Sequence, residues 1–107
     1  MDILDVKRIL QENNICESCC LIDPQPLVEG ALCLCHEKGT GWRVLLNERG
    51  NFLINEFRAS EDAACRLFLS YALSDPTHRK DFRQSDLLNY HERAKALLTK
   101  YGLPSLK

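Results

Sequence analysis

The sequence has almost no net charge and no long apolar run. Its 107 residues carry 14 basic and 15 acidic side chains, which leaves a formal net charge of −1. Proteins that neutralise nucleic-acid phosphates need an excess of basic groups, so the charge balance argues against nucleic acid as a partner. Asp2 and Asp5 interrupt the first apolar positions, and no run is long enough to cross a bilayer. We therefore expect a cytoplasmic protein that binds neither nucleic acid nor membranes.

The sequence also lacks the common motifs of enzymes. It has only five glycines and contains neither a glycine-rich phosphate loop nor a paired-carboxylate motif. His36, His78 and His91 are possible general bases, but no local signature joins any of them to a cysteine nucleophile. We expect a protein that is not an enzyme and that uses no cofactor.

Cysteine is the one chemically reactive residue type in good supply. Five of the six cysteines and one histidine lie in two short clusters: Cys16, Cys19 and Cys20, then Cys33, Cys35 and His36. Such spacing resembles zinc-ligand pairs. However, adjacent residues of a strand point to opposite faces, so Cys35 and His36 could not easily share one ion. We predict reduced thiols and no metal site, with a small cytosolic regulatory interaction module, possibly zinc-stabilised, as the alternative.

The chain is organised around a predicted β-hairpin. Two apolar-rich runs, residues 42–47 and 52–57, flank a polar patch that contains Gly50. Glycine accepts the positive φ that a tight hairpin turn requires. With Arg49 and Gly50 as the loop, Glu48 opposes Asn51. The pairs further along would be Leu46 with Leu53, Val44 with Asn55 and Trp42 with Phe57, on the core face of the sheet.

The remaining segments complete an α+β fold in a single domain over residues 1–107. Apolar periodicity predicts helices over residues 2–13, 61–73 and 85–101, with Asp2 and Ser60 as N-caps. Residues 15–29 contain two closely spaced prolines and are predicted to be a connector. Residues 30–36 would form another strand, with Cys35 opposite Trp42. The expected order is an N-terminal helix, a three-stranded antiparallel meander and two C-terminal helices packed on one face of the sheet.

Polar side chains of the hairpin and of the following helix start are the candidate binding residues. Mixed charges on a rigid hairpin suit charge-complementary recognition of another protein, although the same groups would also serve as a solubilising surface. A basic segment, residues 75–107, leaves nucleic-acid binding by the last helix as a further alternative. The predicted binding residues are Arg43, Asn47, Glu48, Arg49, Asn51, Glu56, Glu61 and Asp62.

Residues 8–73 resemble a family of small immunity proteins that belong to bacterial polymorphic and contact-dependent toxin systems. The resemblance lies in the opening segment 10–15 and in a series of motif residues: Trp42, Val44, Glu48-Arg49-Gly50, Phe57, Ser60-Glu61, Ala64 and Cys65. It implies a non-catalytic cytoplasmic inhibitor, a monomer or weak dimer, whose partner is a cognate toxin domain. Such an inhibitor would cover the active site, or another essential surface, of a nuclease or other enzyme toxin.

Overall fold

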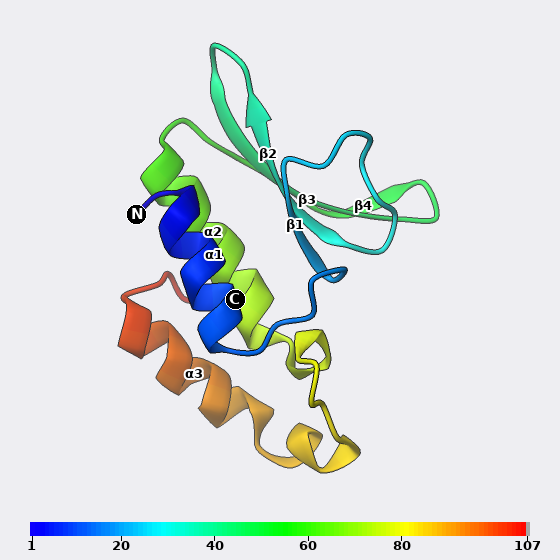
Figure 1. Cartoon of the computed structure of the whole chain (residues 1–107), viewed down its shortest axis with the longest axis vertical. Coiled ribbons are helices and arrows are strands. Elements are labelled where there is room, and N and C mark those ends of the chain that lie inside the picture. The colour runs from blue at the N-terminus through cyan, green and yellow to red at the C-terminus, as the bar shows by residue number, and fades with distance from the viewer. Residues whose placement is uncertain (107) are drawn as a thin grey trace.

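The computed structural model describes residues 1–106, and it has the α+β composition expected from the sequence (Figure 1). Helix α2 packs across β2, β3 and β4, and it is flanked by α1 and α3. No helix within these residues has both the length and the apolar character to cross a lipid bilayer. The elements are α1 (Ile3–Glu12), β1 (Cys20–Ile22), β2 (Leu32–Glu37), β3 (Gly41–Glu48), β4 (Asn51–Arg58), α2 (Glu61–Ser74), two short 3₁₀ helices (Pro76–His78 and Gln84–Leu88) and α3 (Tyr90–Tyr101).

The predicted boundaries of α1 and α2 are confirmed to within one residue, because the expected capping groups are in place. The Asp2 side chain accepts a hydrogen bond from the Asp5 N–H at 3.0 Å, and the Asp5 carboxylate in turn accepts one from the Asp2 N–H at 3.1 Å. Ser60 Oγ accepts from the N–H of Ala63 at 3.1 Å and so begins α2. The predicted start of the last helix was wrong, because residues 84–88 form a separate 3₁₀ helix and α3 begins at Tyr90, after the non-helical Asn89. Its predicted end is confirmed at Gly102, whose φ is 65°.

The sheet has four strands in the order β1-β2-β3-β4, not three, and it is mixed. The prediction that residues 15–29 form only a connector was therefore wrong for Cys20–Ile22, which pairs in parallel with β2. Proline prevents helix and central-strand structure only where it lies. Pro24 and Pro26 come after β1 has ended, so they do not affect it.

The predicted register of β2 is wrong by one residue. Cys35 pairs with Arg43, and His36 pairs with Trp42. The turn closes more tightly than expected, with the Thr40 N–H bonded to the Glu37 carbonyl at 3.0 Å. A shift of one residue exchanges the two faces of a strand. Cys35 and its neighbour Cys33 therefore lie on the outer face, which we define as the sheet face turned away from α2.

The hairpin pairs as predicted only at its tip. Glu48 opposes Asn51, but the register shifts between Leu46 and Asn47, so that Leu46 pairs with Ile54 and Leu53 has no partner on β3. This β-bulge moves the rest of β4 by one residue. The predicted pairs of Leu46 with Leu53, Val44 with Asn55 and Trp42 with Phe57 are accordingly wrong. Val44 instead opposes Glu56, and Trp42 opposes Arg58.

The main core lies between α2 and the inner face of the sheet. Val44, Leu34 and Phe68 are fully buried there, together with residues of α1. A second, smaller cluster on the outer face contains Ala31, Cys33 and Leu45. At the open end of the hairpin, a Cβ atom on Gly41 would lie 2.6 Å from the Arg58 carbonyl oxygen, so only glycine fits there.

Candidate protein-binding surface

Three large apolar side chains on β4 are exposed. Phe52 has 49% of its surface exposed, Leu53 62% and Phe57 37%. Phe52 and Phe57 lie on the outer face, opposite Asn47 and Arg43, and Leu53 is exposed because it is the bulged residue. We call these three residues the β4 patch. Phe52 and Leu53 adjoin the hairpin tip, whereas Phe57 lies near the other end of the strand, so the patch runs along β4. Exposed apolar groups bordered by polar ones are typical of binding surfaces.

Arg43 is held rigidly over this patch. Its Nε lies 2.8 Å from a carboxylate oxygen of Glu37, and its Nη1 lies 2.9 Å from Oδ1 of Asn55. The guanidinium carbon lies 5.4 Å from the centre of the Phe57 ring. The hydrogen bond from Arg43, and to a smaller extent its charge, lowers the pKa of the Glu37 carboxyl, so the pair stays ionised at neutral pH. The predicted binding residue Arg43 thus forms the polar border of the β4 patch.

The hairpin tip carries exposed charges of both signs. Arg49 and Gly50 both have positive φ, 53° and 81°, which is the geometry of a two-residue hairpin turn. Glu48 and Asn51 close this turn, and all four residues are exposed. Within residues 1–106, neither Glu48 nor Arg49 forms an ion pair. Their charges therefore remain available to a partner.

Asn47 joins the tip to the connection between β1 and β2. Its carbonyl oxygen accepts a hydrogen bond from the Gly30 N–H at 2.8 Å. Its side-chain Oδ1 is buried and has no hydrogen-bond partner in the described part of the chain. The same connection exposes Leu27 and Val28. These two residues add apolar surface near the tip.

The other predicted binding residues form internal contacts. Glu56 lies on the inner side of β4, where it accepts a hydrogen bond from the Tyr71 hydroxyl and lies 3.3 Å from the Arg58 guanidinium. The bond to Glu56 and partial burial raise the pKa of Tyr71 to about 12. The hydrogen bond between Glu56 and Tyr71 connects the edge strand β4 to helix α2.

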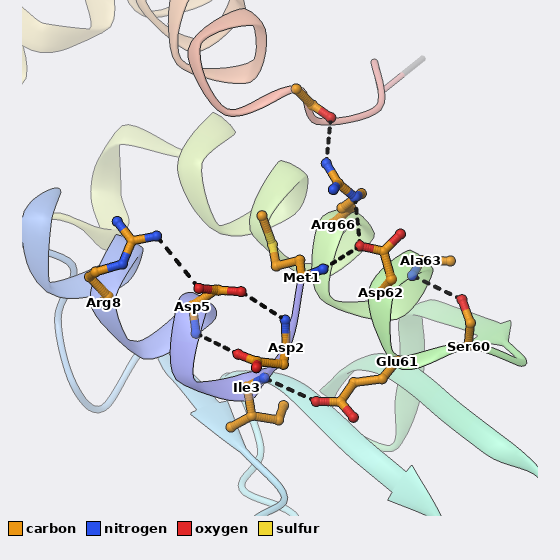
Figure 2. Close-up of polar contacts among 11 residues, drawn as sticks. Met1, Asp2, Ile3, Asp5, Arg8, Ser60, Glu61, Asp62, Ala63 and Arg66 are labelled. Carbon is orange, nitrogen blue, oxygen red and sulfur yellow. Dashed lines mark hydrogen bonds and ion pairs between the residues drawn. The ribbon is translucent and has the colours of Figure 1, made fainter.

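Glu61 and Asp62 hold the N-terminus of α1 against the start of α2, as Figure 2 shows. Glu61 accepts a hydrogen bond from the Ile3 N–H at 3.0 Å. Asp62 pairs with the Met1 amine at 2.6 Å and with Arg66 at 2.9 Å, and both neighbours lower the pKa of its carboxyl. Arg66 also donates to the Gly102 carbonyl at 3.1 Å, which connects the end of α3 to the same corner.

The eight predicted residues therefore divide into two groups. The structure brings five of them together on the hairpin, and the remaining three stabilise contacts among α1, α2 and β4. The five on the hairpin are Arg43, Asn47, Glu48, Arg49 and Asn51. The apolar β4 patch was missed because the symmetric register placed Leu53 and Phe57 in the core. Only the bulge exposes them, and no residue of the hairpin signals a bulge in the sequence.

The histidines and cysteines are dispersed. His36 stacks on Trp42 with ring centres 4.5 Å apart, His78 is half-buried with Nδ1 2.9 Å from the Ala72 carbonyl, and His91 is exposed. The two cysteine clusters considered for zinc lie in different environments. Cys20 packs in the main core and Cys33 in the outer cluster. Across residues 1–106, no three metal-ligating side chains converge.

Comparison of this chain with protein-family models, characterised proteins and solved structures found no match.

Proposed function

We propose that this protein is a cytoplasmic immunity protein that neutralises a cognate bacterial toxin domain by binding it through the hairpin. The observation that carries the proposal is the β4 patch, where Phe52, Leu53 and Phe57 are exposed along one strand that starts at a charged tip. The family resemblance of residues 8–73 supplies the class of partner, which is a nuclease or another enzyme toxin. The protein itself performs no catalysis.

The composition of this surface suits tight association. Protein interfaces usually combine an apolar centre, in which aromatic residues contribute most of the binding energy, with a polar rim. Phe52 and Phe57 supply aromatic anchors, and Arg43 and Glu48 lie at the border. A matching toxin surface would offer an apolar pocket edged by charges of both signs. Covering that surface would block the toxin's active site or another region that it needs.

The hairpin is also well ordered before binding. The turn residues already have the required positive φ, and Arg43 is fixed by Glu37 and Asn55. Groups that are fixed in advance lose less conformational entropy when a complex forms. The free hairpin should therefore bind without rearrangement of its backbone.

The direct test is co-expression with the product of the adjacent upstream gene. We expect the toxin to arrest growth alone, growth to resume when this chain is present, and the two proteins to elute together as a 1:1 complex in size-exclusion chromatography. A neighbouring product that is harmless, or that does not bind the purified chain, would rule out the proposal for that pair.

The charged tip can be tested separately by reversing one charge. Glu48→Lys should slow association with the toxin and change its dependence on salt, while the dissociation rate changes less, because rim charges act mainly on diffusional encounter. Glu92→Lys on α3 is a matched control, since Glu92 is also an exposed glutamate but lies away from the hairpin. Equal association rates for the two variants would place the interface elsewhere.

A further inference from the structure

The connection between α1 and β1 contains a tight turn with a cysteine at each end. The Cys19 N–H donates to the Cys16 carbonyl at 3.1 Å, which closes the turn over residues 16–19. The Cys16 N–H is itself bonded to the His78 carbonyl, and this contact anchors the first residue. A turn closed in this way brings its end Cα atoms within about 7 Å of each other. Disulfides span Cα distances of about 4.4–6.8 Å, so the backbone already has a suitable geometry.

The burial of the three cysteines in this segment determines which two sulfurs can form a disulfide. Cys16 and Cys19 are both half-buried and free, whereas Cys20 is only 6% exposed and packs in the main core. Cys20 begins β1, and successive side chains of a strand point to opposite sides. The Cys20 sulfur is thus directed away from solvent, and Cys19 is the natural partner of Cys16.

The two thiols differ in acidity. Ser18, whose hydroxyl lies 3.1 Å from the Cys16 sulfur, lowers the pKa of Cys16 to about 7, and the neighbouring Cys19 thiol contributes to the same effect. Burial raises the pKa of Cys19. The thiolate is the form that attacks a disulfide. Cys16 is therefore the nucleophile of the pair, and Cys19 is the second thiol.

The Cys16 side is open to a small molecule. A cavity of about 520 Å³ lies between the end of α1 and β1, and Cys16 is part of its wall. Two lysines, Lys7 and Lys80, line the same cavity, and the Lys80 amine lies 3.7 Å from the Glu17 carboxylate. Glu17 also lines the cavity and pairs with Lys80, which leaves Lys7 as the cation there without an ion pair within residues 1–106. The opening has the size for a peptide-sized disulfide, and Lys7 can pair with one of its carboxylates.

We propose that Cys16 and Cys19 form a reversible disulfide by exchange with a small-molecule disulfide such as oxidised glutathione. The Cys16 thiolate attacks one sulfur of the oxidant, which forms a mixed disulfide and releases one glutathione thiolate. The Cys19 thiol then loses its proton and attacks the Cys16 sulfur, releasing the second glutathione. Two protein thiols are oxidised, one oxidant disulfide is reduced to two thiols, and excess reduced glutathione reverses both steps.

The test uses the fully reduced protein, oxidised glutathione, acid quenching, and intact-mass and peptide mass spectrometry. The wild type should lose two hydrogens, with the bond mapped to Cys16 and Cys19. Cys19→Ser should stop at one glutathionyl group on Cys16, and Cys16→Ser should form no disulfide within the turn. The rate of the first step should rise with pH and reach half of its maximum near the Cys16 pKa of about 7.

Cys35 provides the matched control. It is half-buried like Cys16, but burial raises the pKa of its thiol to about 11. Cys35→Ser should react as the wild type does, and Cys35 should remain unmodified in every variant. Modification of Cys35 at the rate of Cys16, accumulation of mixed disulfide in the wild type, or bonds between two chains in place of the internal bond would each overturn the proposal.

Discussion

Replacing Leu53 with asparagine tests whether the β4 patch carries toxin binding. Leu53 is 62% exposed and has no cross-strand partner on β3. Substitutions at exposed positions of this kind usually change the free energy of unfolding by less than about 0.5 kcal/mol. Asparagine has nearly the shape of leucine but a polar amide in place of the branched methyls. Leu53→Asn should therefore fold normally and change only the surface.

The expected loss of affinity follows from the exposed fraction. Fully burying a leucine side chain contributes about 1.5–3 kcal/mol. With 62% of Leu53 exposed in the free protein, a partner can bury at most that fraction. The binding free energy should then fall by about 1–2 kcal/mol, which corresponds to a Kd roughly 5–30-fold higher. The cost of burying the new amide adds to this loss.

The measurement is isothermal titration of the toxin domain with wild type, Leu53→Asn and Leu88→Asn, with thermal melts to check folding. Leu88 is the matched control, because it is 88% exposed and belongs to the 3₁₀ helix Gln84–Leu88, which lies below the hairpin in Figure 1 and is not part of the β4 patch. Leu88→Asn should leave the Kd unchanged. A wild-type Kd for Leu53→Asn, or an equal loss for Leu88→Asn, would refute the assignment of the surface.

Three further predictions concern stability. Phe68→Ala should lower the free energy of unfolding by about 3–5 kcal/mol in denaturant titrations, because Phe68 is fully buried in the main core; a loss below about 1 kcal/mol would contradict the described packing. Glu61→Ala should cost about 1 kcal/mol by removing the acceptor for the Ile3 N–H, whereas Glu17→Ala, which alters only an exposed ion pair, should cost almost nothing. Asp62 has a lowered pKa in the folded state, so its stabilising effect is present above the unfolded pKa of about 3.8 and is lost as pH falls through the lower folded value. Asp62→Asn should therefore be less stable than wild type at neutral pH, and melts at decreasing pH should show the difference shrinking below pH ~4; a difference that persists at low pH would contradict the sign.

The helices could be predicted from the sequence because their determinants are local. Apolar spacing defines α1 and α2, and the caps Asp2 and Ser60 fix their first residues. The end of α3 was also predictable from a local signal, because Gly102 adopts the positive φ that ends a helix. Each of these signals acts within a few residues, so it does not depend on how distant segments pack.

The sheet was harder to predict because strand pairing depends on distant partners. The three residues of β1 form a strand only because β2 lies beside them. The bulge at Leu53 places Ile54 and Glu56 on the inner face, toward α2, instead of Leu53 and Asn55. A hairpin without a bulge fits the apolar pattern of residues 42–57 equally well. A difference of one residue in the pairing of β4 decides which of its side chains face α2.

The hairpin turn is the part of the candidate site that could be predicted from the sequence. The exposed tip from Glu48 to Asn51 follows from the demand for positive φ at Arg49 and Gly50. In the sequence, Glu61 and Asp62 look as free to bind a partner as the charged residues of the hairpin tip. Their partners, the backbone of Ile3 and the Met1 amine, lie about sixty positions away along the chain and come close only in the folded molecule.

The two ends of the β3–β4 hairpin have opposite tolerance for sequence change. At the open end, the Arg58 carbonyl leaves no room for a side chain on Gly41. At the closed end, a Cβ atom on Gly50 would meet nothing within 4 Å, but the φ of 81° at Gly50 still favours glycine. A randomised library over residues 48 and 51–53, with Gly41 and the turn residues Arg49 and Gly50 kept, should therefore yield many folded members with altered recognition. Under the proposed immunity function, changes at these positions would redirect one scaffold to new toxins as the toxins diverge.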